Sequence, residues 1–111
     1  MKGYDKMLHG YFDLPTFSFF EQNNIWTGSM FRYFSYRIMP IKRKPDDEKK
    51  SELHLYVWYG LECFDNVKSF VAEYSEDYSQ EGLDAIIEKL SAEFEKYKPI
   101  RKEVENNTKF R

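Results

Sequence analysis

The most regular pattern of apolar and polar positions in this chain predicts one long amphipathic helix. Between residues 80 and 98, apolar side chains recur at spacings of three and four, which places them along one side of a helix. They are Leu83, Ile86, Ile87, Leu90, Phe94 and Tyr97. Ser79 is suited to cap the first turn, and Pro99 is expected to end the helix. The pattern therefore predicts a main helix over about 80–98.

Ahead of this helix, aromatic and alternating segments predict β-strands. Residues 30–39 are mostly aromatic or β-branched, and residues 51–61 alternate with a period of two. The charged segment 43–50 between them is predicted to be a hairpin loop. On the second strand, one face carries the apolar residues Leu53, Leu55, Val57 and Tyr59. We expect the helix to pack on that face.

Shorter segments complete the predicted fold. Residues 16–20 and 25–27 flank two asparagines that tolerate a tight turn, so they are predicted to form a hairpin. Residues 69–74 are predicted to be a strand, with a short helix from Phe64 as the alternative. Residues 100–111 are expected to be a frayed charged tail. The predicted class is α+β, an antiparallel sheet of about three to five strands with the main C-terminal helix on one face.

The face of the sheet opposite the helix carries further rings. His54, Tyr56 and Trp58 point away from the aliphatic set on their strand. We expect the N-terminal segment to fold over this face, because exposed patches of several aromatic residues are uncommon on monomers. The apolar residues of that segment are Phe12, Leu14, Phe17, Phe19, Phe20 and Trp26. The alternatives are a homodimer through this face and an aromatic surface that binds a partner.

Length and composition indicate one folded domain over residues 1–111. Aromatic residues make up 19% of the 111 positions, and burying these rings offsets the conformational entropy lost on folding. No apolar run is long enough to span a membrane, and no signal-peptide pattern is present, so no membrane association is expected. A single cysteine, Cys63, allows no internal disulfide. We therefore expect a cytoplasmic protein.

The residues able to support catalysis form no recognisable motif. His9, His54 and Cys63 are too few for a structural zinc site, which generally takes four ligands. Glycines occur singly, so no phosphate-binding loop is predicted. Pairs of carboxylates occur only in segments expected to be exposed, whereas catalytic pairs need burial. We expect no catalytic residue, no metal and no cofactor, with a small enzyme of unrecognised type as an alternative.

The uneven distribution of charge, in a chain of net charge −2, indicates a surface for a protein partner. Acidic residues surround the start and outer side of the predicted helix: Glu73, Glu76, Asp77, Glu81, Asp84, Glu88, Glu93 and Glu95. Such a surface would dock on a basic groove. In size and charge alone, the chain resembles small inhibitors that mimic nucleic acid, such as anti-restriction and anti-CRISPR proteins, and no motif ties it to them. We expect a non-enzymatic protein that binds a macromolecule, above all a protein such as a nucleic-acid-binding one, through this surface or through Tyr56 and Trp58.

A nucleic-acid-binding module is the alternative. Aromatic rings stack on bases while basic side chains neutralise phosphates. Segment 30–44 combines several rings with Arg32, Arg37, Lys42, Arg43 and Lys44. The net negative charge and the absence of an RNA-recognition sequence pattern weigh against this function.

Overall fold

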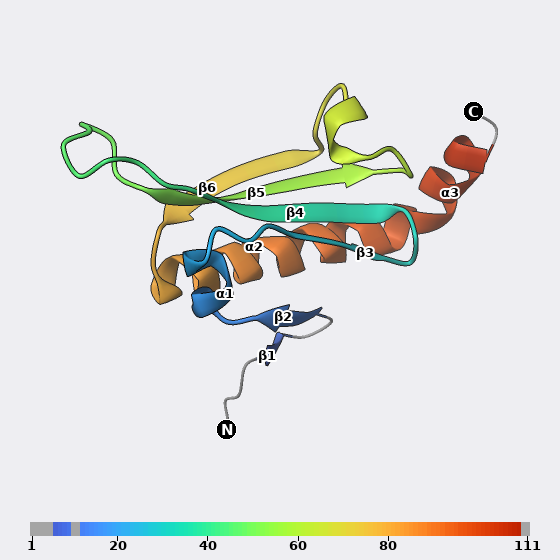
Figure 1. Cartoon of the computed structure of the whole chain (residues 1–111). Coiled ribbons are helices and arrows are strands. Elements are labelled where there is room, and N and C mark those ends of the chain that lie inside the picture. Colours follow the sequence, from blue (N-terminus) through green and yellow to red (C-terminus); the bar gives the residue numbers. More distant parts are fainter. Residues whose placement is uncertain (1–5, 10–11, 110–111) are drawn as a thin grey trace.

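An antiparallel four-stranded sheet with one long helix across one face forms the body of the protein (Figure 1). The structure, a computed structural model, describes the backbone of residues 6–9 and 12–109 and the side chains of residues 14–107. Its elements are β1 (Lys6–His9), β2 (Phe12–Pro15), α1 (Phe17–Glu21), β3 (Trp26–Met30), β4 (Phe34–Ile41), β5 (Glu52–Tyr59), η1 (Phe64–Asn66), β6 (Ala72–Asp77), α2 (Gln80–Tyr97), η2 (Lys98–Ile100) and α3 (Arg101–Lys109). The predicted α+β class is confirmed.

The main sheet has the strand order β3-β4-β5-β6, and each neighbouring pair is antiparallel. β1 and β2 pair with each other in a separate two-stranded sheet. The charged segment 43–50 lies in the loop that joins β4 to β5, as predicted. Because each strand of the main sheet pairs with the next one along the chain, β3 and β6 are the two edges.

α2 covers one face of the sheet with the apolar stripe that the sequence predicts. Its first turn is capped by Ser79, whose Oγ accepts a hydrogen bond from the Gly82 amide at 3.0 Å. All six stripe residues are buried, and they meet the inward side chains of β4 and β5. Those inward residues are Phe34, Tyr36, Ile38, Leu53, Leu55 and Val57. Burial of each such side chain contributes roughly 1.5–3 kcal/mol before the entropy cost of folding.

The N-terminal segment lies on the same side of the sheet as α2, so the prediction that it covers the opposite face is wrong (Figure 1). Leu14 and Phe20 are fully buried in the core that α2 forms with the sheet. Residues 17–21 form a helix rather than the predicted strand. Phe17 and Phe20 stand three positions apart, a spacing that lets one short helix direct both rings toward the core. The side chain of Phe12 lies outside the described residues.

The chain turns once within the segment predicted as a continuous strand over 30–39. Met30 pairs with Phe34, and residues 31–33 form the turn between β3 and β4. Phe31 and Arg32 adopt φ values of 50° and 72°, in the left-handed region that non-glycine residues rarely occupy. The Phe31 ring packs against Phe94 of α2 at a centroid distance of 5.5 Å, and this contact helps to hold the turn.

The C-terminal residues form a helix, whereas the sequence predicts a frayed tail over 100–111. α2 ends at Tyr97, and Pro99 lies in the short 3-10 helix η2 that follows it directly. The chain then continues as α3. The Arg101 guanidinium lies 4.0 Å from the centre of the Phe31 ring, and Val104 packs against the core. These two contacts hold the C-terminal helix against the domain. The charged composition of the segment does not predict them.

The segment between β5 and β6 combines the two alternatives considered for it. Residues 64–66 form the short 3-10 helix η1, and the predicted strand is confirmed but begins later, at Ala72. The predicted strand at 25–27 is likewise confirmed in part, as β3. Figure 1 shows the segment between β5 and β6, residues 60–71, which we call the η1 segment, on the face of the sheet opposite α2.

Candidate functional site

The aromatic face opposite α2 is covered by the protein's own η1 segment. Tyr56 lies 5.1 Å from Phe64 and 5.0 Å from Phe70, measured between ring centroids. Trp58 retains only 3% exposure, and its Nε1 donates to the Glu62 carbonyl at 2.9 Å. The rings of Tyr56 and Trp58, which the sequence suggests as a partner surface, therefore pack mainly within the domain.

The acidic residues predicted to form one surface are divided between several parts of the protein. Glu81, Asp84 and Glu88 are exposed and share the outer side of α2, at spacings of three and four. Glu73 is on β6 and pairs with Tyr56 of β5, and Glu76 forms an ion pair with Lys89 at 3.1 Å. Asp77 ends β6 and is exposed.

Glu93 of α2 points inward, so the prediction that it lies on the outer acidic side of the helix is wrong. It retains 3% exposure, and its Oε2 accepts hydrogen bonds from the Tyr74 hydroxyl at 2.6 Å and from Lys96 Nζ at 3.0 Å. The hydrogen bond to Glu93 is the main cause that raises the pKa of Tyr74, with partial burial as a second cause. This buried group stabilises the contact between α2 and β6.

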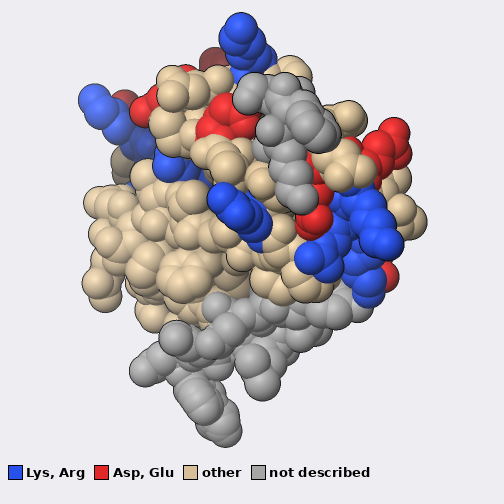
Figure 2. All heavy atoms as spheres, turned by 90° about the vertical axis from the view of Figure 1, so that its right-hand side faces the viewer, with Lys and Arg blue, Asp and Glu red and all other residues tan. Residues whose placement is uncertain are grey.

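The basic residues predicted to bind nucleic acid are mostly engaged in contacts within the domain. The Arg37 guanidinium stacks 4.1 Å from the centre of the Phe64 ring, and Lys42 Nζ donates to the Glu21 carbonyl at 2.6 Å. Arg43 pairs with Glu52, whereas Arg32 and Lys44 are exposed. Figure 2 shows basic and acidic side chains side by side at the end of the molecule that carries α3, next to a broad area without charge.

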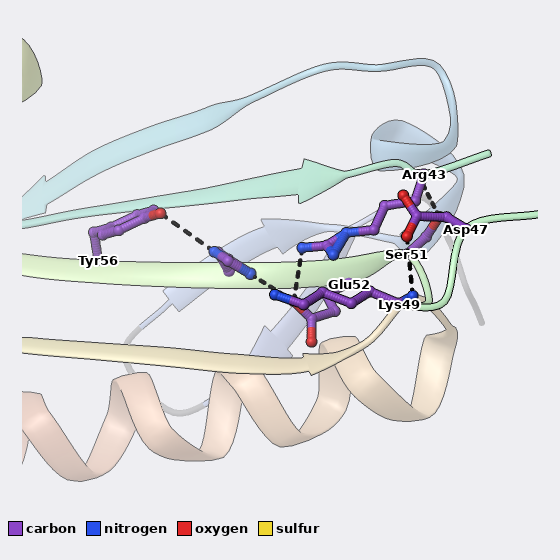
Figure 3. Close-up of polar contacts among 7 residues, drawn as sticks. Arg43, Asp47, Lys49, Ser51, Glu52 and Tyr56 are labelled. Carbon is purple, nitrogen blue, oxygen red and sulfur yellow. Dashed lines mark hydrogen bonds and ion pairs between the residues drawn. The ribbon is translucent and has the colours of Figure 1, made fainter.

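A row of polar side chains runs along the face of β5 opposite α2, near the start of the strand (Figure 3). His54 contacts Tyr56 Oη through Nδ1 at 3.2 Å and Glu52 Oε1 through Nε2 at 2.9 Å. The Glu52 carboxylate also pairs with Arg43 at 3.5 Å. With the ring proton on Nε2, His54 donates to Glu52 and accepts from Tyr56.

The pKa shifts of Glu52 and Tyr56 indicate that this row of polar side chains has a structural role. The pKa of Glu52 is lowered, mainly by its hydrogen bond with His54. Burial is the second-largest effect and opposes this shift, while the nearby positive charges, which include Arg43 and Lys49, lower the pKa further. Burial, followed by the charge of Glu73, raises the pKa of Tyr56, so its hydroxyl stays protonated at neutral pH. A tyrosine nucleophile needs the opposite shift. These contacts tie the start of β5 to Arg43 at the start of the β4–β5 loop.

β3 is an edge strand of the main sheet. Within the described residues it pairs only with β4. The Val57 carbonyl accepts from the Val71 amide at 2.8 Å, so the backbone groups of Val57 point toward β6. Backbone direction alternates along antiparallel strands, so the groups of Tyr36, which lies opposite Val57, point toward β3. Gly28 of β3 pairs with Tyr36, so its backbone groups point toward β4. The backbone groups of its neighbours, Thr27 and Ser29, therefore point to the open edge.

Two hollows flank β3, one on each face of the sheet. On the α2 side, a hollow of about 390 Å³ is lined by Pro15, Phe19 and Trp26 together with the polar residues Thr16, Ser18, Gln22 and Asn24. On the opposite face, a hollow of about 340 Å³ is lined by residues that include Thr27, Ser29, Arg32, Arg37, Glu62 and Cys63. The edge strand therefore runs between an apolar recess and a recess with two guanidinium groups and one carboxylate.

The two edges of the sheet differ in charge. β6 carries Glu73, Glu76 and Asp77, and charged residues on an edge strand discourage pairing with another chain. β3 lies in segment 22–31, which contains no charged residue although 32% of the chain is charged. Predictions made from periodic apolar positions and from clusters of charge miss this run without charge. It marks β3 as the edge that lacks protection against strand pairing.

Comparisons with known proteins do not assign the chain to a family: no family model matches it, and neither the curated proteins nor the solved structures give a significant match. In the described part of the chain, no helix is long and apolar enough to cross a membrane. Across the same residues, no three His, Cys, Asp or Glu side chains converge as a metal site would require.

Proposed function

We propose that this protein is a non-enzymatic binding protein that takes up an extended segment of a partner protein as an additional strand along β3. The observation that carries the proposal is the open, uncharged edge of β3 between two hollows. In strand addition, backbone hydrogen bonds supply affinity and pockets for alternate side chains supply specificity. β3 offers both features.

The backbone of β3 supports an antiparallel or a parallel partner strand. Thr27 and Ser29 each present an N–H and a C=O at the open edge. Each hydrogen bond formed there contributes about 0.5–1.5 kcal/mol net, so side chains in the hollows must supply most of the affinity. A short edge strand of this kind fits a transient complex better than a permanent one.

A second candidate surface is the outer side of α2. Glu81, Asp84 and Glu88 are exposed there, and within the described residues none of the three forms an ion pair. Asp84 accepts a hydrogen bond from Gln80 at 3.0 Å, and the three negative charges together would attract a basic protein surface. Reversing all three charges should then weaken binding to a basic protein and flatten its salt dependence, and unchanged binding would exclude this surface.

The strand-addition proposal is tested by removing one outward N–H. Ser29→Pro removes the amide at the open edge and leaves the hydrogen bonds to β4 in place, because proline is tolerated at edge positions whose N–H faces solvent. Ser29→Ala is the matched control, since it keeps the amide. Circular dichroism and thermal denaturation establish that both variants fold.

The binding readout is selection from a displayed library of random nine-residue peptides. We expect wild-type protein and Ser29→Ala to enrich the same peptides, and Ser29→Pro to bind them at least tenfold more weakly than Ser29→Ala, which lacks the same hydroxyl but keeps the amide. An absence of enriched peptides, or equal binding by Ser29→Pro, would refute the proposal. Light scattering is the second measurement: a dimer that Ser29→Pro abolishes would show that a second copy, not a partner protein, occupies the edge.

A further inference from the structure

We infer that the β3 site selects extended segments that place an acidic side chain on the face opposite α2 and an apolar side chain on the α2 side. This inference rests on the proposed function and adds the chemistry of the partner. It follows from the different linings of the two hollows and from the geometry of an added strand.

The hollow opposite α2 favours an anionic side chain. Arg32 and Arg37 contribute two positive charges against the single carboxylate of Glu62. Arg37 is held in place, because its Nε donates to Thr27 Oγ1 at 3.0 Å and its guanidinium stacks on Phe64. A guanidinium fixed in this way binds a carboxylate with little further loss of side-chain entropy.

Hydroxyl groups add polar contacts in the same hollow. Thr27 and Ser29 are exposed on the face opposite α2, and they line the hollow next to the arginines. Ser35 lines it as well, although its hydroxyl already donates to the Gly60 carbonyl at 3.2 Å. An aspartate or glutamate of the partner would therefore meet two guanidinium groups and nearby hydroxyls.

The hollow on the α2 side favours an apolar side chain. Its walls include Pro15, Phe19 and Trp26, and its volume of about 390 Å³ admits a large aliphatic or aromatic group. Phe19 and Trp26 are already packed edge to face at a centroid distance of 5.7 Å, so the wall is preformed. Filling such a recess with a Leu or Phe side chain removes apolar surface from water.

The order of the two side chains in the partner follows from strand geometry. Successive side chains of a strand point to opposite faces of the sheet. An acidic and an apolar residue that fill the two hollows must therefore stand an odd number of positions apart, at i and i+1 or i and i+3. Two residues an even number apart would both point to the same face.

The test uses the peptides enriched by the displayed library. We expect Asp or Glu to occur in them at an odd separation from Leu, Ile, Phe or Met. Replacing that acidic residue with Lys should weaken binding to the wild-type protein at least tenfold, measured by fluorescence polarisation with labelled peptides. Moving it by one position, to an even separation, should weaken binding by a similar factor.

Variants of the protein assign the preference to the basic hollow. Arg32→Gln changes an exposed side chain, so the fold should be retained, and it should reduce the Glu-over-Lys preference of each peptide severalfold. Lys44→Gln makes the same change of charge at an exposed position that does not line the hollow. It should leave the preference unchanged.

The outcomes separate this inference from the proposed function. Peptides that bind, and lose binding to Ser29→Pro, but show no acidic preference would overturn the inference and keep strand addition. Equal effects of Arg32→Gln and Lys44→Gln would also overturn it, because long-range charge would then explain the preference. A library that yields no peptide sensitive to Ser29→Pro removes strand addition itself.

Discussion

The buried carboxylate of Glu93 gives the sharpest test of how α2 is held on the sheet. Its hydrogen bond with the Tyr74 hydroxyl measures 2.6 Å, a short distance typical of a charge-assisted bond. Hydrogen bonds to charged groups contribute about 1.5–3 kcal/mol. We expect Tyr74→Phe to lower the free energy of unfolding by an amount near the lower end of this range, because Tyr74 is only half-buried and water can replace its hydroxyl.

The assay is urea denaturation at pH 7 with linear extrapolation to water. Tyr78→Phe is the matched control, since the Tyr78 ring packs edge-on against Phe17 and the described residues give its hydroxyl no hydrogen bond. The control should change stability by less than about 0.5 kcal/mol. If both variants were equally stable, the Glu93 carboxylate would not depend on Tyr74, and the stabilising role assigned to this contact would be wrong.

The pH dependence of the same pair supplies a second measurement. The pKa of Tyr74 is raised above its ordinary value of 10.0, mainly by the hydrogen bond to Glu93. A raised pKa means that the folded state holds the proton more tightly, so this contribution is complete below about pH 10 and is lost as the pH rises through the folded-state pKa. Wild-type protein should therefore lose stability more steeply above pH 10 than Tyr74→Phe does.

Three further variants test the core and the junctions of the fold. Leu90→Ala removes a fully buried residue of the α2 stripe and should cost about 2–5 kcal/mol in urea denaturation; an unchanged midpoint would contradict the packing of α2. Gly82→Ala would stabilise an ordinary helix by about 1 kcal/mol, but here the added methyl group meets the backbone of Asp77, so we expect a loss of about 1–3 kcal/mol by the same assay. The Tyr97 hydroxyl is buried without a hydrogen-bond partner among the described residues, so Tyr97→Phe should raise the melting temperature, and a lower one would reveal a partner.

Local periodicity determined the parts of the fold whose burial pattern is regular. The stripe from Leu83 to Tyr97 and the alternation from Leu53 to Tyr59 each specify one apolar face, and the structure packs these faces together. The cap at Ser79 follows from its side-chain chemistry and its place before the stripe. These features depend on residues close together in the chain, so a single sequence is enough to predict them.

Tertiary contacts decided the parts in which local preference is ambiguous. Residues 17–21 are rich in phenylalanine and favour a strand locally, but their rings reach the core beside α2 only from a helix. Residues 101–109 have the composition of a tail, and they are docked through Arg101 on Phe31, a contact across 70 positions of the chain.

The candidate site belongs to the second group. The sequence contains the uncharged run 22–31, but only the strand order β3-β4-β5-β6 makes that run an edge. The approach of Arg37 to Phe64 likewise depends on the η1 segment folding over the sheet. The sequence by itself determined which faces are apolar, because side-chain spacing fixes a face within one element. The tertiary structure alone decided which edge stays open, because an edge exists only after all the strands have paired.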